Sequence, residues 1–113
     1  MKIAVIIVSY NTSQLLHACL TSLVYTGSAH EVEIFVVDND SRDDSVAMVR
    51  RHFPQVRLIA NSQNLGFAAA NNQAYKEISG DYLVLLNPDA QLKRGSLDRI
   101  VDFMEANPRV GIC

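Results

Sequence analysis

The hydrophobic pattern of the chain predicts short buried strands that alternate with helices. Residues 3–8 form an unbroken apolar run rich in β-branched side chains, and residues 34–37 and 82–86 form two more runs. Because the first run does not alternate apolar with polar residues, both of its faces should be covered, as in a parallel sheet. Residues 56–60 predict a further strand, in which Arg57 interrupts the apolar run and indicates a half-exposed edge position.

Apolar residues at helical spacing predict a helix after each strand. The first predicted helix carries the stripe Leu15, Leu16, Cys19, Leu20 and Leu23, and an alanine-rich segment predicts another helix over residues 68–78. Residues 110–113 are predicted to begin a fifth strand. The predicted helix starts and stops are marked by capping, charged or breaking residues: Thr12 or Ser13, Gly27, Asp43, Asp44, Pro54, Ser96, Asn107 and Pro108.

This order of strands and helices predicts one α/β domain over residues 1–113 with right-handed crossovers. The formal net charge is −2 and there is no block of Lys and Arg, which argues against nucleic acid as the main partner. No segment reaches the ~20 apolar residues of a membrane-spanning helix. Cys19 and Cys113 match no metal-ligand spacing, and a buried free thiol at Cys19 fits a reducing, cytosolic setting.

A polar cluster follows each of the four strands, at residues 9–11, 38–40, 61–64 and 87–89. In a parallel sheet these clusters lie at the same carboxyl edge, where open α/β sheets bind their ligands. We therefore expect Tyr10, Asp38 and Asp89 to share one surface, although they are far apart in the sequence.

Two missing motifs narrow the choice of ligand. No G-x-G-x-x-G follows the first strand and no G-x-x-x-x-G-K-[ST] occurs, so no backbone cradle for a pyrophosphate is evident. A divalent cation on Asp89 would balance such a charge instead. Tyr10 could stack on a base, the Asp38 carboxylate could accept a hydrogen bond from a pyrimidine ring N–H, and the Asn39 amide offers a donor and an acceptor.

Each of these assignments has an alternative. Asp89 and Asp38 also fit turns at strand ends, and Tyr10 also fits a packed aromatic. Asn71 and Asn72 are poor helix formers, so they indicate a tertiary contact with either the backbone or a ligand.

Four pieces of the sequence together resemble the nucleotide-sugar-binding half of family 2 glycosyltransferases, which have the GT-A fold. They are Val-Ile-Ile-Val-Ser-Tyr-Asn at 5–11, Val-Val-Asp-Asn-Asp-Ser at 36–41, Asn-Leu-Gly-Phe-Ala-Ala-Ala-Asn-Asn at 64–72, and Leu-Leu-Asn-Pro-Asp at 85–89. The last two look most like the branch that includes rhamnosyltransferases. The resemblance implies a three-layer α/β/α, Rossmann-like fold with a mainly parallel sheet in the order 3-2-1-4.

The resemblance also implies roles for single residues. Asp38 and Asn39 would read a pyrimidine base, and Asp89 would bind Mg2+ or Mn2+ at the position of an Asp-x-Asp motif. Asn87 replaces the first aspartate of that motif, which should weaken metal affinity. The remaining residues would line the base and ribose pocket or border the donor site: Ser9, Tyr10, Asn11, Asn64, Gly66, Phe67, Asn71 and Asn72.

The implied reaction is inverting transfer of a sugar from a dTDP- or UDP-sugar to a saccharide or lipid-linked acceptor, in the cytoplasm or at the inner face of its membrane. We find no catalytic base within residues 1–113 and expect an N-terminal, donor-binding portion of a longer enzyme. One alternative is a non-catalytic α/β regulatory or interaction module. Another expectation is self-association through the strand edges at residues 82–86 and 110–113.

Overall fold

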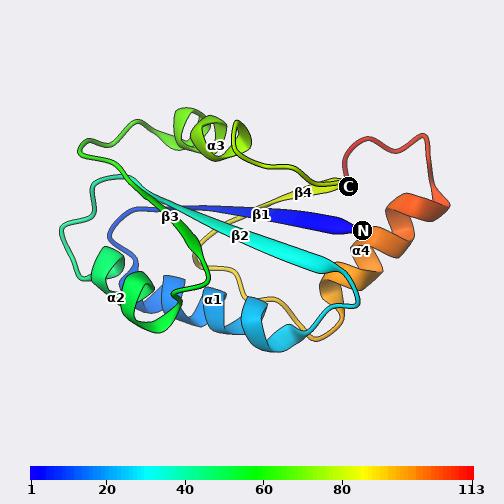
Figure 1. Ribbon diagram of the computed structural model, residues 1–113, viewed down its shortest axis with the longest axis horizontal. Helices are drawn as coiled ribbons and strands as arrows, with labels where there is room; N and C mark the ends of the chain where they lie inside the picture. Colours follow the sequence, from blue (N-terminus) through cyan, green and yellow to red (C-terminus); the bar gives the residue numbers. More distant parts are fainter.

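In the computed structural model, which describes residues 1–113, four parallel strands form one sheet (Figure 1). The strands are β1 (Lys2–Ser9), β2 (Glu31–Asp38), β3 (Arg57–Ala60) and β4 (Tyr82–Leu86). Their order is β3-β2-β1-β4, which confirms the predicted order and places β3, with its exposed Arg57, at an edge.

Helices cover both faces of the sheet, which confirms the three-layer α/β/α arrangement. Helices α1 (Ser13–Thr26), α2 (Ser45–His52) and α4 (Ser96–Ala106) pack on one face, and α3 (Phe67–Tyr75) packs on the other (Figure 1). The larger core joins alternate residues of β1 to the three helices, whereas Ile6 faces Ala70 and Ala74 of α3. Both faces of β1 are thus buried, and each buried isoleucine contributes roughly 1.5–3 kcal/mol.

One predicted helix cap, Thr12, is confirmed in position but not in its hydrogen bond, and another, Ser96, is wrong. Thr12 is the N-cap of α1, but its hydroxyl pairs with the Ser9 hydroxyl at 2.9 Å and caps no helical N–H. Gly95, with φ of 78°, is the N-cap of α4, so Ser96 is already the first helical residue. Glycine adopts this left-handed conformation without the steric cost of a side chain, which lets the helix begin one residue earlier than predicted.

Three further boundaries differ from the predicted ones. Helix α2 begins at Ser45, so the two aspartates before it lie outside its first turn. Helix α3 ends at Tyr75, because the Glu77 and Ile78 N–H groups bond three residues back and tighten the chain into a turn. Residues 110–113 form no strand: the Val110 N–H bonds to the Asn107 carbonyl at 2.9 Å, which closes a turn instead of a ladder.

Candidate functional site

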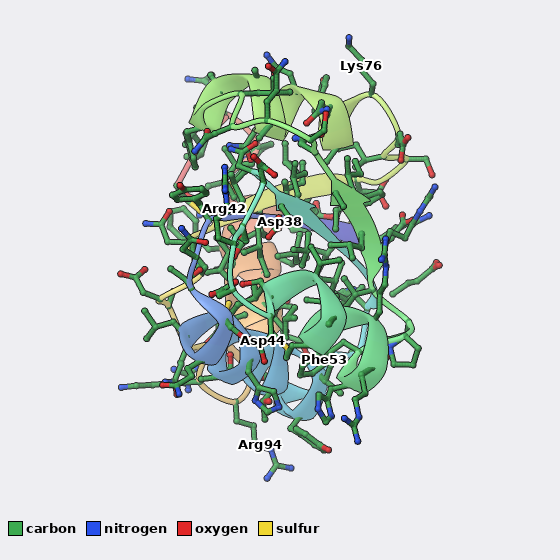
Figure 2. The ribbon with its side chains drawn as sticks, turned by 90° about the vertical axis from the view of Figure 1, so that its left-hand side faces the viewer. Asp38, Arg42, Asp44, Phe53, Lys76 and Arg94 are labelled. Carbon is green, nitrogen blue, oxygen red and sulfur yellow. The ribbon has the colours of Figure 1, made fainter.

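The polar clusters after the strands meet at one edge of the sheet. Ser9 pairs with Asp38 across β1 and β2, Asp38 pairs with Ala60 of β3, and Ile7 pairs with Leu86 of β4. The end of β1 therefore lies between Asp38 and the triplet at 87–89. Figure 2 views the molecule from this edge, with Asp38 near the middle, α3 above it and α1 and α2 below.

Asp38 is buried with one carboxylate oxygen unpaired. The residue is 2% exposed, and its Oδ2 accepts the Ser41 N–H at 2.8 Å, as the turn alternative requires. Its Oδ1 is buried and has no hydrogen-bond partner. Leaving a buried polar oxygen unpaired costs about 1–3 kcal/mol, and such an atom in a native protein calls for a functional explanation. A ligand that donates a hydrogen bond to Oδ1 would remove this cost.

The loops that follow β1 and β2 are interlocked beside Asp38. Asn11 adopts φ of 51° and Asp40 adopts φ of 67°, a left-handed region that asparagine and aspartate tolerate better than most residues. The Asn11 N–H donates to the Ser41 Oγ at 2.9 Å, and the Asn11 Oδ1 accepts the Arg42 N–H at 2.7 Å. Asn11 thus joins the two loops to each other.

Two aromatic rings stand exposed at this edge. Tyr10 is 48% exposed and Phe67, at the start of α3, is 58% exposed. Neither ring is part of the core, so both present apolar surface to solvent beside the polar clusters. Ser9, in contrast, is fully buried, and its hydroxyl is shared with that of Thr12.

The predicted asparagines mostly contact the chain itself. Asn39 is 3% exposed and bonds to Leu65 and Gly66, and the Asn64 Oδ1 accepts the Gly66 N–H at 2.9 Å. The Asn71 side chain donates to the Phe67 carbonyl of its own helix at 3.0 Å. This bond lies within α3, so it is a local backbone contact and not the predicted tertiary one.

The triplet at 87–89 forms an exposed turn above a buried thiol. Asn87 and Asp89 are exposed, and the turn closes through the Ala90 N–H and the Asn87 carbonyl at 3.0 Å. The Cys19 thiol donates to the same carbonyl at 3.7 Å. Burial, together with the nearby negative charge of Asp89, raises the pKa of Cys19 to about 11. The free, buried thiol predicted at Cys19 is confirmed.

The exposed donors of the triplet fit a cation that is shared with a ligand. No group of three or more His, Cys, Asp or Glu side chains is placed to hold a metal ion by itself. Asp89 and the amide oxygen of Asn87 are hard oxygen donors, and Mg2+ commonly binds one or two protein carboxylates together with substrate phosphates. The chain therefore suits a metal that arrives with a phosphorylated ligand.

Two residues that support the site were not predicted from the sequence. Ser41 bonds to both Asn11 and Asp38, and its position directly after the 38–40 cluster could have indicated it. Gln73 bonds to Asn61, but nothing in the pattern of α3 distinguishes it.

No helix of the structure combines the length and the hydropathy needed to cross a membrane.

Comparison with known proteins finds the same family over almost the whole chain. The sequence profile described as "Glycosyl transferase family 2" matches residues 4–113. The N-acetylglucosaminyl-diphospho-decaprenol L-rhamnosyltransferase of Mycobacterium tuberculosis is 28% identical over 118 residues, which cover 95% of this chain and 38% of that protein. The poly(ribitol-phosphate) beta-glucosyltransferase of Bacillus spizizenii is 31% identical, covering 95% of this chain and 18% of its own length.

Solved structures share the fold. The mannosyltransferase PcManGT of Pyrobaculum calidifontis, in complex with GDP-Man and Mn2+, aligns with a TM-score of 0.85 and 29% identity, over 96% of this chain and 33% of that one. S. aureus TarS in complex with UDP-GlcNAc aligns with a TM-score of 0.81 at 24% identity, which shows the fold alone. The chain thus spans less than two fifths of the length of each of these proteins.

Proposed function

The chain belongs to glycosyl transferase family 2, and on that premise we propose that residues 1–113 form the nucleotide-sugar-binding domain of an inverting glycosyltransferase. The whole enzyme would transfer a sugar, rhamnose first among the candidates, to a saccharide or lipid-linked acceptor in cell-surface polysaccharide synthesis. A lipid-linked acceptor would place it at the inner face of the cytoplasmic membrane. The family match favours this function over a non-catalytic regulatory module.

The unpaired Oδ1 of Asp38 is the observation that carries the proposal. Uracil and thymine carry a ring N–H that this oxygen can accept, whereas the corresponding ring nitrogen of cytosine has no hydrogen. A buried acceptor discriminates strongly against a ligand that leaves it unpaired. Asp38 therefore favours UDP- or dTDP-sugars over CDP-sugars, and the exposed ring of Tyr10 offers a surface on which the base could stack.

Asp89, with the Asn87 amide oxygen, would hold Mg2+ or Mn2+ against the diphosphate of the donor. When bound, the ion neutralises negative charge on the leaving nucleoside diphosphate. A single carboxylate predicts weak metal binding in the absence of nucleotide. We assign no catalytic base among residues 1–113.

Calorimetric titration of the chain with UDP, dTDP and CDP, with and without Mn2+, tests the proposal. We expect UDP and dTDP to bind in the presence of Mn2+, and CDP to bind at least about tenfold more weakly because it leaves Asp38 unpaired. Asp89→Ala should remove the dependence on Mn2+, and Asp38→Asn should remove the preference over CDP. Asp102→Ala, at an exposed position of α4 outside the site, is the matched control.

Absence of binding by the folded chain under all these conditions would contradict the proposed function. A dependence on Mn2+ that survives in Asp89→Ala would show that Asp89 does not hold the metal.

A further inference from the structure

The amide of Asn39 is buried and engaged by the chain itself. Its Oδ1 accepts hydrogen bonds from the Asn61 Nδ2 at 3.2 Å and from the Leu65 N–H at 3.4 Å. Its Nδ2 donates to the Gly66 carbonyl at 3.1 Å. An amide oxygen has two lone pairs, so Asn39 has no acceptor left to offer a ligand.

Asn61 extends this contact to helix α3. Its Nδ2 donates to the Gln73 Oε1 at 2.8 Å, and its Oδ1 accepts from the Gln73 Nε2 at 2.9 Å. The Asn61 backbone N–H also bonds to the Asp38 carbonyl at 2.9 Å. The side chains of Asn39, Asn61 and Gln73, which we call the amide cluster, therefore join the end of β2 to α3.

The amide cluster contacts the start of α3 at Gly66. Its φ of 82° and ψ of 174° suit glycine, and no side chain caps the helix there. The Gly66 carbonyl accepts the Ala70 N–H of the first helical turn at 3.3 Å as well as the Asn39 amide. Phe67 follows directly and is 58% exposed at the carboxyl edge. Asn39 is thus bonded to the N-cap residue of α3, directly before Phe67.

We propose that Asn39 is a positioning residue, which fixes residues 64–67 beside the bound nucleotide and does not itself read the base. The inference rests on the proposed function, because it assigns recognition of the base to Asp38 and the positioning of residues 64–67, in the same site, to Asn39. It differs from the expectation that Asn39 contacts the pyrimidine directly.

The variant Asn39→Asp tests this role. It keeps the acceptor for Asn61 and Leu65, removes the donor to the Gly66 carbonyl, and places a carboxylate against that carbonyl. In the chain without ligand, hydrogen exchange of the Ala70 amide, which bonds to the Gly66 carbonyl, should accelerate about tenfold, because the lost bond no longer holds that carbonyl in place. Affinity for UDP and dTDP should fall about tenfold, with the preference over CDP unchanged.

Two further variants make the test specific. Asn107→Asp is the matched control, since its amide donates to the Phe103 carbonyl at 2.8 Å at the far end of α4. It should change neither exchange in residues 64–70 nor nucleotide affinity. Gln73→Glu lies at a half-buried position and removes one donor of the amide cluster, so it should reproduce the effects of Asn39→Asp more weakly even if that variant folds poorly.

The outcomes separate this inference from the proposed function. An altered preference between UDP and CDP in Asn39→Asp would overturn the positioning role in favour of direct reading of the base. Unchanged exchange in residues 64–70, or faster exchange with unchanged nucleotide affinity, would also overturn it. If the unmodified chain binds no nucleotide, the proposed function fails, while faster exchange in the variant would still support the hold of Asn39 on residues 64–67.

Discussion

Asp38, the last residue of β2, and Asp43, in the loop that follows, show how surroundings decide what a carboxylate contributes to stability. Asp43 accepts the Ser13 N–H at 3.1 Å and the Ser45 N–H at 3.0 Å, together with the Ser45 hydroxyl. Partial burial alone would raise the pKa of Asp43, but these hydrogen bonds outweigh it and hold that pKa below its ordinary value. Asp38 is more deeply buried and leaves Oδ1 unpaired. Asp43 therefore stabilises the loops, whereas the unpaired oxygen of Asp38 lowers the free energy of unfolding.

This contrast predicts opposite effects of the same substitution. Asp38→Asn should raise the free energy of unfolding by about 1 kcal/mol, because a neutral amide costs less to bury than an unpaired carboxylate. Asp43→Asn should lower it, because a carboxylate that accepts several hydrogen bonds is lost. Urea unfolding at pH 7 measures both changes. Loss of stability in Asp38→Asn would show that the Ser41 contact outweighs the unpaired oxygen.

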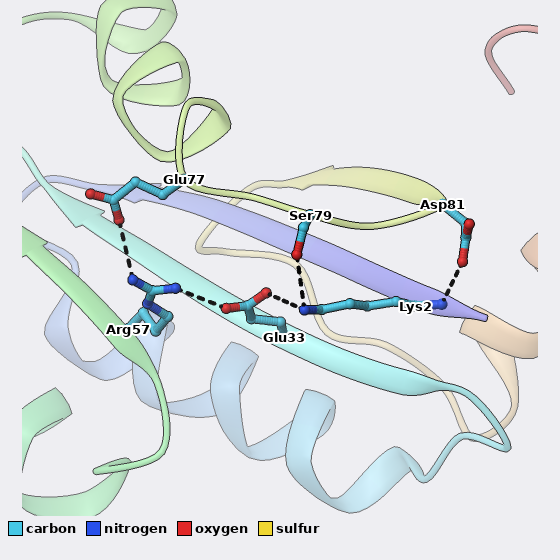
Figure 3. A network of polar contacts seen from close by, with 6 residues as sticks. All are labelled: Lys2, Glu33, Arg57, Glu77, Ser79 and Asp81. Atoms are coloured by element: carbon cyan, nitrogen blue, oxygen red, sulfur yellow. Dashed lines mark hydrogen bonds and ion pairs between the residues drawn. The ribbon is translucent and has the colours of Figure 1, made fainter.

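At the scale of elements, a charged network fastens β1, β2 and β3 to the connection before β4 (Figure 3). The Glu33 carboxylate pairs with the Lys2 Nζ at 3.3 Å and with the Arg57 Nη1 at 3.1 Å. Arg57 also reaches Glu77 at 3.6 Å, and the Lys2 backbone N–H donates to the Asp81 Oδ2 at 2.9 Å. Glu33 is thus the shared anion between two strands on either side of its own.

The network predicts a pH-dependent contribution from Glu33. Partial burial would raise its pKa, but hydrogen bonds and charges from Arg57 and Lys2 hold the pKa below its ordinary 4.5. A depressed pKa stabilises the fold above the unfolded-state pKa, and this contribution disappears as the pH falls through the folded-state pKa. Glu33→Gln should therefore lower stability at pH 7 by at most about 1 kcal/mol, since solvent screens partly exposed pairs.

Urea unfolding of Glu33→Gln and of the unmodified chain between pH 7 and pH 3 checks this prediction. The difference between them should be full at pH 7 and shrink from about pH 4.5 downward. Glu31→Gln, at an exposed position of the same strand that forms no ion pair, should show no such difference. A difference that stays constant with pH would show that Glu33 acts through packing rather than charge.

Strands β2 and β4 show which features of the fold can be predicted from the sequence and which cannot. The apolar runs located every strand, and β4 spans the predicted residues 82–86 although it is an edge strand with alternately exposed side chains. The apolar runs did not predict that β2 begins at Glu31. Its first residues pair with β1 from Lys2 onward, so hydrogen bonds between the strands, rather than burial, hold them in the sheet. A hydrophobic pattern carries no information about which backbone groups of a strand pair with its neighbour.

The candidate site follows the same division. The apolar runs in the sequence show where each strand ends. It was therefore predictable that residues 9–11, 38–40 and 87–89 meet at one edge of the sheet. The partners of Asn39 were not, because Asn61, Leu65, Gly66 and Gln73 come within reach of its amide only through the fold. The residue type gave the hydrogen-bonding capacity, and the tertiary structure decided which groups occupy it.

At the scale of the whole molecule, β4 is an uncovered edge of the sheet (Figure 1). Its sequence Tyr-Leu-Val-Leu-Leu contains no charge and no proline, the features that normally protect an edge strand. Leu83 is 39% exposed and Leu85 is 53% exposed, because α3 packs over β1 and β2 and leaves them uncovered. A cavity of about 690 Å³ lies between β4, α4 and residues 111–113, and its mostly apolar lining includes Leu83 and Leu85.

This edge predicts that the chain associates with a second copy of itself through β4. Pairing of two β4 edges would satisfy their free backbone N–H and C=O groups and cover the exposed leucines. Static light scattering over a dilution series should show an average mass that falls toward that of a monomer. Leu85→Lys places a charge on the exposed face of the edge and should give a monomer at every concentration. Tyr25→Lys alters a side chain that is 81% exposed on α1 and should leave association unchanged. A mass for the unmodified chain that stays monomeric and insensitive to dilution would contradict edge pairing.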